Sequence, residues 1–313
     1  MSAKRSIALL GTLGVGLLLA WWLARPSGPS RPEPPPVVVP RPDVPAVLPI
    51  AKVDVAPPTG DALIEAVTDM DNPKRRELAT LGLSGKRTAG EIQALSVYLT
   101  ERPVGGAAHW TREFAHRDVL MNTLRAQSQN RDHVISTFAR VYQNPRQGDT
   151  LRGYALQHLA LLYRDASREL TQGQREQILV TLRGALPERA DGTLASTALV
   201  GLQEIASIDS TGVSSDEVSS LALELMRDPS ANALTRISAL QIAGENKLGA
   251  AEADARRLAD DPAQDRVVRM AAIWTLGQLG AGGAARQRLT NDPDPFIRGA
   301  ASASLARTKD IAL

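Results

Sequence analysis

The stretch DRVVRMAAIWTLGQLG, Asp265–Gly280, decides the fold of this 313-residue chain. At 100° per residue its apolar side chains fall on one side, as they do in an amphipathic helix. The aspartate that opens the stretch can accept hydrogen bonds from free backbone N–H groups, and the closing glycine tolerates the positive φ at which many helices end. The stretch predicts one short, complete helix with its apolar side formed by Val268, Ala272, Leu276 and Leu279.

Three other stretches repeat the pattern of an arginine followed by small and apolar residues at helical spacing. They are DTLRGYALQHLALL with Arg152, LTRISALQIAG with Arg236 and DPFIRGAASASLA with Arg298. The copy that follows Pro187 lacks the arginine, and Leu194 is expected in its place. Prolines precede the copies at intervals of 42, 42, 33 and 31 residues, at Pro145, Pro187, Pro229, Pro262 and Pro293.

Second amphipathic helices are expected between these copies, in REQILVTLRGAL and DEVSSLALELM. A single unit of two such helices cannot bury its apolar faces without a neighbour, so units that recur every 30 to 45 residues or so stack in a row. The period therefore predicts an all-α fold, an α-solenoid. The apolar sides of the two second helices are Ile178, Leu182, Ala185 and Leu186, and Val218, Leu221, Ala222 and Leu225.

From Pro145 to its end, the chain resembles HEAT repeats of the short bacterial kind. The first helix of such a repeat reads Asp, an apolar residue and Arg, then Ala and Leu at helical spacing; the stretches that begin at Asp265 and Asp292 match closely. The resemblance implies HEAT-like helical hairpin repeats, which we expect over residues 103–313 after an N-terminal helical cap over residues 59–102. It also implies that second helices line the concave face. It implies no particular function, because unrelated proteins share such repeats.

The repeated arginines and alanines are expected to be structural. A small side chain permits close approach of successive first helices. An arginine near the start of a helix can reach Asp149, Asp265 or Asp294 three or four residues earlier, or the counterpart in the next unit, and such pairs between repeats are common. The alanines at the expected contacts are Ala155, Ala239, Ala272 and Ala301.

Residues 1–24 have the composition of a membrane anchor. The tail, residues 1–6, contains Lys4 and Arg5, and the 18 residues from Ile7 to Ala24 contain no charge. As a helix they would span roughly 27 Å, close to a hydrocarbon core of about 30 Å, and two tryptophans near the end favour the membrane interface. We expect a single transmembrane signal anchor over residues 7–24. A cleaved signal peptide is the alternative, although bulky residues flank its candidate cleavage sites.

Residues 25–58 are rich in proline and predict an extended, disordered linker of up to roughly 100 Å. Residues 1–52 contain six basic and two acidic residues, a charge of +4, which leaves −2 for the remainder. The basic pI therefore belongs to the anchor and linker, and we expect no nucleic acid partner. A short basic tail kept inside predicts a bacterial inner-membrane protein with a single pass and its C-terminal domain in the periplasm.

No catalytic or cofactor motif is evident. The chain has no cysteine, which excludes disulfides, cysteine nucleophiles and lipoprotein attachment. The four histidines form no paired metal motif, so we expect no metal and no cofactor, and a cluster of His109, Glu113 and His116 is a minor alternative. His158 is expected to be hydrogen-bonded at a helix contact.

These features predict a membrane-tethered scaffold or adaptor that binds a protein or peptide partner of the cell envelope through a HEAT-repeat surface. The alternatives are an enzyme whose site the sequence does not reveal and an adaptor that faces the cytoplasm. Arginines that point away from the apolar sides of second helices could pair with carboxylates of an acidic partner, although charge there could also simply keep the surface soluble. The candidate partner-binding residues are Arg183, Arg227, Arg256, Arg257, Arg286 and Arg288.

Overall fold

The computed structural model describes residues 60–311, apart from residues 70, 81, 84, 102–106 and 191. In this part of the chain every regular element is a helix, and no strand occurs. The α-helices are α2 (Asp61–Thr68), α3 (Pro73–Thr80), α4 (Ala89–Thr100), α5 (Ala107–Arg125), α6 (Arg131–Gln143), α7 (Asp149–Ala166), α8 (Gln172–Ala185), α9 (Leu194–Ala206), α10 (Ser215–Arg227), α11 (Ala233–Glu245), α12 (Glu252–Asp260), α13 (Arg266–Gln278), α14 (Gly283–Leu289) and α15 (Pro295–Ile311).

The chain divides into two compact units, Met1–Pro57 and Pro58–Leu313, and all the described residues belong to the second unit. The predicted tail, transmembrane anchor and linker, residues 1–58, lie outside the described residues and stay predictions. Within the described ranges, no helix is both long enough and apolar enough to cross a membrane.

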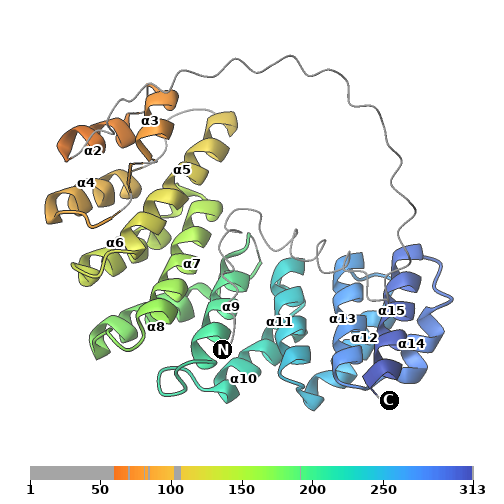
Figure 1. The fold of residues 1–313 in the computed structure, drawn as a ribbon. Coiled ribbons are helices and arrows are strands. Elements are labelled where there is room, and N and C mark those ends of the chain that lie inside the picture. The colour runs from red at the N-terminus through yellow and green to blue at the C-terminus, as the bar shows by residue number, and fades with distance from the viewer. Residues whose placement is uncertain are drawn as a thin grey trace, which may run out of the picture. The chain divides into compact units, whose positions relative to one another are not determined.

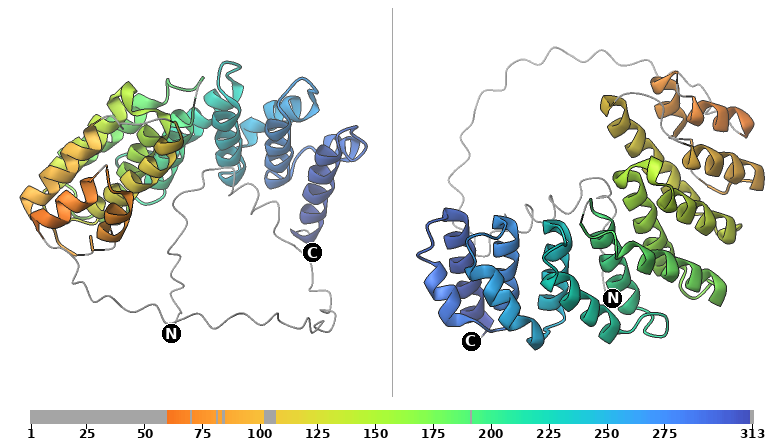
Figure 2. Two further views of the ribbon diagram at one scale, coloured as in Figure 1. Left: turned by 90° about the horizontal axis from the view of Figure 1, so that it is seen from above. Right: turned by 180° about the vertical axis from the view of Figure 1, so that it is seen from behind.

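From α4 onward the helices alternate between two layers (Figures 1 and 2). The first layer holds α5, α7, α9, α11, α13 and α15, and each of these packs against its neighbour within the layer. The second layer holds α4, α6, α8, α10, α12 and α14, and each packs against the helix that follows it in the chain. The fold is therefore a helical repeat, as the two-helix period predicted.

Helix α13 forms where the stretch Asp265–Gly280 predicted a helix. Its N-cap is Asp265, whose Oδ1 accepts a hydrogen bond from the backbone N of Val267 at 2.8 Å. The chain leaves the helix at Gly280, where φ is +65°. The predicted apolar side is confirmed, because Ala272 and Leu276 are fully buried.

Successive first-layer helices approach each other closely because small residues lie between them. The requirement is clearest at two glycines. A Cβ on Gly244 of α11 would lie 2.7 Å from Cζ3 of Trp274 in α13, and a Cβ on Gly277 would lie 2.3 Å from Oγ of Ser304 in α15. The alanines expected at these contacts are fully buried: Ala155, Ala239, Ala272 and Ala301.

Helix α9 corrects the expected register of the copy that lacks the arginine. In the other first helices, the buried alanine follows the arginine by three positions, and in α9 the fully buried alanine at the corresponding place is Ala198. The position equivalent to the arginine is therefore Ala195 and not Leu194. Packing against the neighbouring helix sets this register, whereas counting from the preceding proline missed it.

Arg269 in α13 joins its own helix to the preceding helix α12 and to the loop before α15. It is buried in α13, and its Nε donates to the carbonyl oxygen of Ala259 in the last turn of α12 at 3.0 Å. Its Nη2 donates to Oδ2 of Asp292, in the loop before α15, at 2.6 Å. The expected structural role is confirmed but the partner is different, because Asp265 caps its own helix. A buried cation held in this way depends on groups from both neighbouring units.

Arg152 repeats this arrangement in α7. Its Nε donates to the carbonyl oxygen of Tyr142 in α6 at 2.7 Å, and its Nη2 lies 2.6 and 2.8 Å from the two carboxylate oxygens of Glu188, ahead of α9. The predicted contact with Asp149 is also present, at 3.2 Å. Arg298 differs, since its Nη1 donates to the backbone carbonyl oxygens of Asp292 and Pro293 and not to a carboxylate.

The repeated prolines follow residues that form a local turn. In Asn-Pro and Asp-Pro pairs, the side-chain oxygen accepts a hydrogen bond from the backbone N two residues later, as in an Asx-turn. The distances are 2.8 to 3.0 Å. The proline spacing therefore marks recurring turns into the first helices, at Asn144, Asp228, Asp261 and Asp292.

We predict that Arg269→Ala lowers the free energy of unfolding by about 3 kcal/mol, because the buried carboxylate of Asp292 and the carbonyl of Ala259 lose their donor. Arg266→Ala is the matched control. Arg266 also pairs with an aspartate of that loop, Asp294, at 2.6 Å, but its side chain is 56% exposed, so we expect a loss below about 1 kcal/mol. Urea unfolding of the purified full chain measures both free energies. Equal losses would contradict the role of Arg269 in joining neighbouring units.

Candidate partner-binding surface

The six candidate arginines lie on the second layer, on α8, α10, α12 and α14. Within residues 58–313 the row of helices bends toward the first layer, so that the second layer lies on the outer side (Figures 1 and 2). The expectation that second helices line the concave face is wrong for this chain. Close contacts through glycine and alanine allow the first layer to be the shorter of the two.

Arg183 and Arg288 link neighbouring second-layer helices, as Arg227 also does between α10 and α12. Arg183 in α8 binds both carboxylate oxygens of Glu217 in α10, at 2.7 and 2.8 Å, and its Nη2 donates to the carbonyl oxygen of Gly212 at 3.1 Å. Arg288 in α14 pairs with Asp260 of α12 at 3.0 Å. Because both pairs are open to solvent, each contributes little to stability, and Arg183 already uses most of its donors.

Three others meet around α12. Arg227 of α10 pairs with Asp254 at 2.7 Å, and Arg257 lies 3.4 Å from the same carboxylate. Arg256 pairs with Glu252 one turn earlier in the helix, at 2.5 Å. Arg257 is the most weakly held of the three, and its side chain is 55% exposed.

Arg286 is not a surface residue. It is 2% exposed, and its Nη1 donates to the backbone carbonyl and to the Oγ of Ser304 in α15, at 3.0 and 3.1 Å. The short helix α14 buries Ala285, Arg286 and Leu289, which places Arg286 on the side that packs against α15. Burial lowers the pKa of its guanidinium. The prediction that it points outward as a binding residue fails for this reason.

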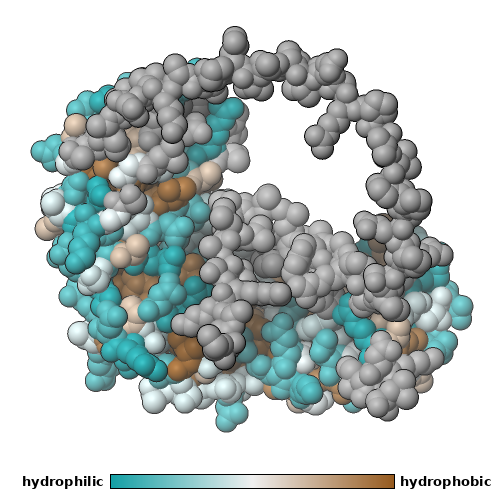
Figure 3. Space-filling model, viewed as in Figure 1, coloured by the Kyte–Doolittle hydropathy of each residue, from teal (hydrophilic) through white to brown (hydrophobic). Residues whose placement is uncertain are grey.

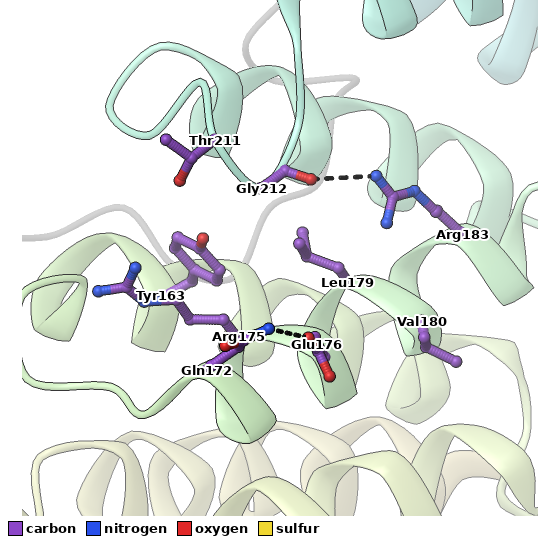
Figure 4. A pocket seen from close by; sticks show the side chains of 9 residues that line it. All are labelled: Tyr163, Gln172, Arg175, Glu176, Leu179, Val180, Arg183, Thr211 and Gly212. Carbon is purple, nitrogen blue, oxygen red and sulfur yellow. Dashed lines mark hydrogen bonds between the residues drawn. The ribbon is translucent and has the colours of Figure 1, made fainter.

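A hollow of about 530 Å³ lies between α8 and the loop that follows α9 (Figure 4). Its residues come from the end of α7, from two ridges of α8 and from that loop. The contact of Arg183 with Gly212 crosses it at one end. The lining residues are Tyr163, Gln172, Arg175, Glu176, Leu179, Val180, Arg183, Thr211 and Gly212.

The hollow combines a buried apolar floor with an exposed apolar edge. Leu179 and the ring of Tyr163 are buried, whereas Val180 is 68% exposed, more than any other large hydrophobic residue in the described part of the chain. The visible surface elsewhere is mainly hydrophilic with separate hydrophobic patches (Figure 3). Gly212 lets the loop approach, since a Cβ there would lie 2.7 Å from Oη of Tyr163.

Asp209 holds the loop side of the hollow in place. It accepts hydrogen bonds from Oη of Tyr163 at 2.8 Å and from the Oγ1 and backbone N of Thr211, and Nη1 of Arg175 lies 3.6 Å from it. The hydrogen bonds from Thr211 and Tyr163 lower the pKa of Asp209, and burial raises the pKa of Tyr163 to about 12. Both groups therefore stay in their usual charge states at neutral pH, with no sign of acid–base chemistry.

Sequence reasoning identified only Arg183 among the residues of the hollow. Tyr163, Arg175 and Asp209 come from segments whose approach depends on the loop after α9, and no local pattern shows that approach. The available signal was Val180, an apolar residue outside the predicted apolar side of α8.

A buried polar cluster joins the N-terminal helices. The carboxylate of Glu113 in α5 binds Nη1 of Arg76 in α3 at 2.7 Å, Oη of Tyr98 in α4 at 2.6 Å and Nε of Arg117 at 2.7 Å. Although burial opposes the shift, the hydrogen bonds from Tyr98 and Arg117 lower the pKa of Glu113. Through these bonds Glu113 joins α3, α4 and α5.

Two of the described histidines, His116 and His158, have hydrogen-bond partners within the fold, whereas Nε2 of His133 is buried without a partner among the described residues. Burial lowers the pKa of His116 to about 4, and its Nε2 lies 2.7 Å from the carbonyl oxygen of Val67. His158 is buried with Nε2 2.9 Å from Oδ1 of Asp118, which confirms the predicted hydrogen bond at a helix contact. Among the described residues, no group of three or more His, Asp or Glu side chains could hold a metal ion.

Comparisons with known proteins add no functional assignment. No protein-family model and no curated protein matches the chain. Among solved structures, the chain is similar to human deoxyhypusine hydroxylase in complex with glycerol, at 15% sequence identity and a TM-score of 0.34; the match covers 80% of this chain and 96% of that chain. A score this low carries no argument about activity.

We predict a pH-dependent effect of Asp209→Asn. A carboxyl group whose folded pKa is lowered stabilises the fold above its unfolded pKa, near 3.8, and that contribution is lost as the pH falls through the folded pKa. The variant should be less stable than the parent at neutral pH, by about 1 kcal/mol, and the difference should shrink below pH 3.8. Urea unfolding over this pH range measures it, and a constant difference would argue against the lowered pKa.

Proposed function

We propose that the chain is a membrane-tethered scaffold of the bacterial cell envelope, which binds a protein or peptide partner through the second layer of a HEAT-like repeat. It acts without catalysis and without a cofactor. The observation that carries the proposal is the hollow beside Val180. Stacked repeats provide extended surfaces of this kind, on which a few side chains supply most of the binding energy.

The chemistry around the hollow fits a protein partner. An apolar side chain of the partner that covers Val180 and reaches the floor at Leu179 would remove exposed apolar surface from water. Arg175 and Arg183 place positive charge at the sides of the hollow. Arginine next to an apolar pocket is a frequent combination at protein interfaces.

The tether is supported by the sequence of residues 1–58. The charge-free segment Ile7–Ala24 is long enough to span a bilayer, and the proline-rich linker of residues 25–58 would hold the repeats away from the membrane. We place the protein in the inner membrane, with a single pass and with its C-terminal domain in the periplasm. An anchor of this orientation leaves the second layer open to envelope partners.

We predict that a reporter enzyme that is active only after export is active when fused to Leu313. The fusion should sediment with membranes, and deletion of residues 1–24 should abolish reporter activity. Recovery of the active fusion in the soluble periplasm would indicate a cleaved signal peptide. A fusion that is inactive for this reporter but active for a cytoplasmic one would contradict the periplasmic placement and favour the adaptor that faces the cytoplasm.

We predict that Val180→Glu abolishes partner capture without unfolding the chain, because a charge on the rim cannot be covered by an apolar side chain. Val200→Glu is the matched control, since Val200 is also exposed but lies on the first layer. The full chain with a C-terminal tag is isolated from native membranes and its co-purifying proteins are quantified. Equal capture by parent and Val180→Glu would remove the hollow as the binding site.

A further inference from the structure

Arg236 in α11 departs from the arrangement of its two counterparts. Arg152 and Arg269 each bind a carboxylate of the following loop, Glu188 and Asp292. The corresponding contact of Arg236 is with a neutral amide: its Nη1 donates to Oε1 of Gln264 at 2.7 Å. The repeat therefore places a cation here without the carboxylate that its other copies supply.

The Nε of this guanidinium also lacks a hydrogen-bond acceptor among the described residues. In Arg152 and Arg269 the Nε donates to a carbonyl at the end of the preceding second helix. The Nε of Arg236 is buried and has no hydrogen-bond partner among the described residues. Leaving a charged donor without an acceptor costs free energy, so this guanidinium is held less firmly within the fold than its two counterparts.

Nearby carboxylates do not fill the place. Asp228 pairs with Arg189 at 2.8 Å and accepts from Ser230. Asp261 accepts from the side chain of Gln264 and from the backbone N of Ala263, at 2.9 Å each. Both act on Arg236 only through their charge, and neither forms an ion pair with it in the part of the chain that the structure describes.

The charge of Arg257, near the end of α12, acts on Arg236. Arg257 lies one turn before Asp261 in α12, and the backbone N of Asp261 donates to its carbonyl oxygen. Burial, and then the charge of Arg257, lower the pKa of Arg236, as expected for two guanidinium groups that lie close together. In the described ranges Arg257 forms one ion pair, with Asp254 at 3.4 Å, and Asp254 pairs more closely with Arg227.

We propose that Arg236 and Arg257 form a binding site for a carboxylate group on an acidic segment of the partner protein. The ligand carboxylate replaces the amide oxygen of Gln264 and takes the role that Glu188 and Asp292 have in the other copies. Two guanidinium groups present several donors in fixed planes and suit a bidentate acceptor. This inference rests on the proposed function and gives the partner its chemistry: an acidic side chain at this edge of α11 and α12.

The repeat itself suggests the decisive variant. Gln264→Glu restores the carboxylate that the other copies have, so it should fill the site from within. Because the variant also removes the donor that Gln264 offers to Asp261, we expect little change in the midpoint of thermal unfolding, and we expect binding of an external carboxylate to weaken about tenfold. Both arginines remain in this variant, so loss of binding cannot be attributed to loss of the cations.

The test uses a fluorescein-labelled hexaglutamate peptide, with hexaglutamine as the uncharged probe, and the purified full chain. Fluorescence anisotropy should show about tenfold weaker hexaglutamate binding for Arg236→Gln, Arg257→Gln and Gln264→Glu. Arg256→Gln is the matched control, because Arg256 neighbours Arg257 and has the same charge but pairs with Glu252. Its affinity should equal that of the parent.

Other outcomes overturn the proposal. Equal weakening by Arg256→Gln would show attraction by general surface charge, and absence of hexaglutamate binding by the parent would show that no such site exists. Binding of inorganic phosphate that depends on Gln264, without binding of hexaglutamate, would assign a phosphate ligand instead. If the chain still captures a partner that the Gln264→Glu variant binds equally well, the site is wrong while the proposed scaffold function stands.

Discussion

The described structure depends on the hydrogen bonds that a buried arginine makes to both neighbouring units. The guanidinium of Arg269 is removed from water, and it is stable there only because Ala259 on one side and Asp292 on the other accept its hydrogen bonds. Neither acceptor belongs to α13. A buried cation that loses one partner is strongly destabilising, so each unit is stable only between its neighbours. At Arg152 and Arg269 this dependence adds to the burial of apolar faces between units, for which every unit of the row needs a neighbour.

The two layers therefore differ in how they contribute to stability and to binding. The first layer holds the buried Arg152 and Arg269 and the close contacts at Gly244 and Gly277, where an added methyl group would collide with the next helix. The second layer is joined mainly by ion pairs open to solvent, such as Arg183 with Glu217, and these contribute little to stability. Residues of the second layer can therefore change without loss of the fold, which leaves this layer free for binding.

Much of the fold could be predicted from the sequence, because helical period, caps and small residues act locally. The cap at Asp265 and the positive φ at Gly280 follow from a single stretch. The partners of the arginines could not be predicted, since Asp292 and Glu188 lie in loops whose paths depend on packing. The position of Arg286 could not be predicted either: the sequence pattern placed its side chain away from the apolar side of its helix, but packing against α15 buries it. For the site, only the apolar Val180 was visible as a local irregularity; the loop that completes the hollow was not.

Apart from Arg298 in α15, the departures from the repeated arginine contacts lie close together in the chain, between α8 and α12. Helix α9 has Ala195 in place of the arginine, and the nearby loop supplies Arg189 instead, which pairs with Glu224 and Asp228 on the surface. The hollow lies beside this same helix, and the next unit contains Arg236 with its neutral partner. In a repeat, positions that keep the pattern are those that hold neighbouring units together. Positions that differ from the pattern do not join neighbouring units in this way. Exposed apolar side chains and unpaired charges at these positions lower the stability of the free protein, and a bound partner would cover them.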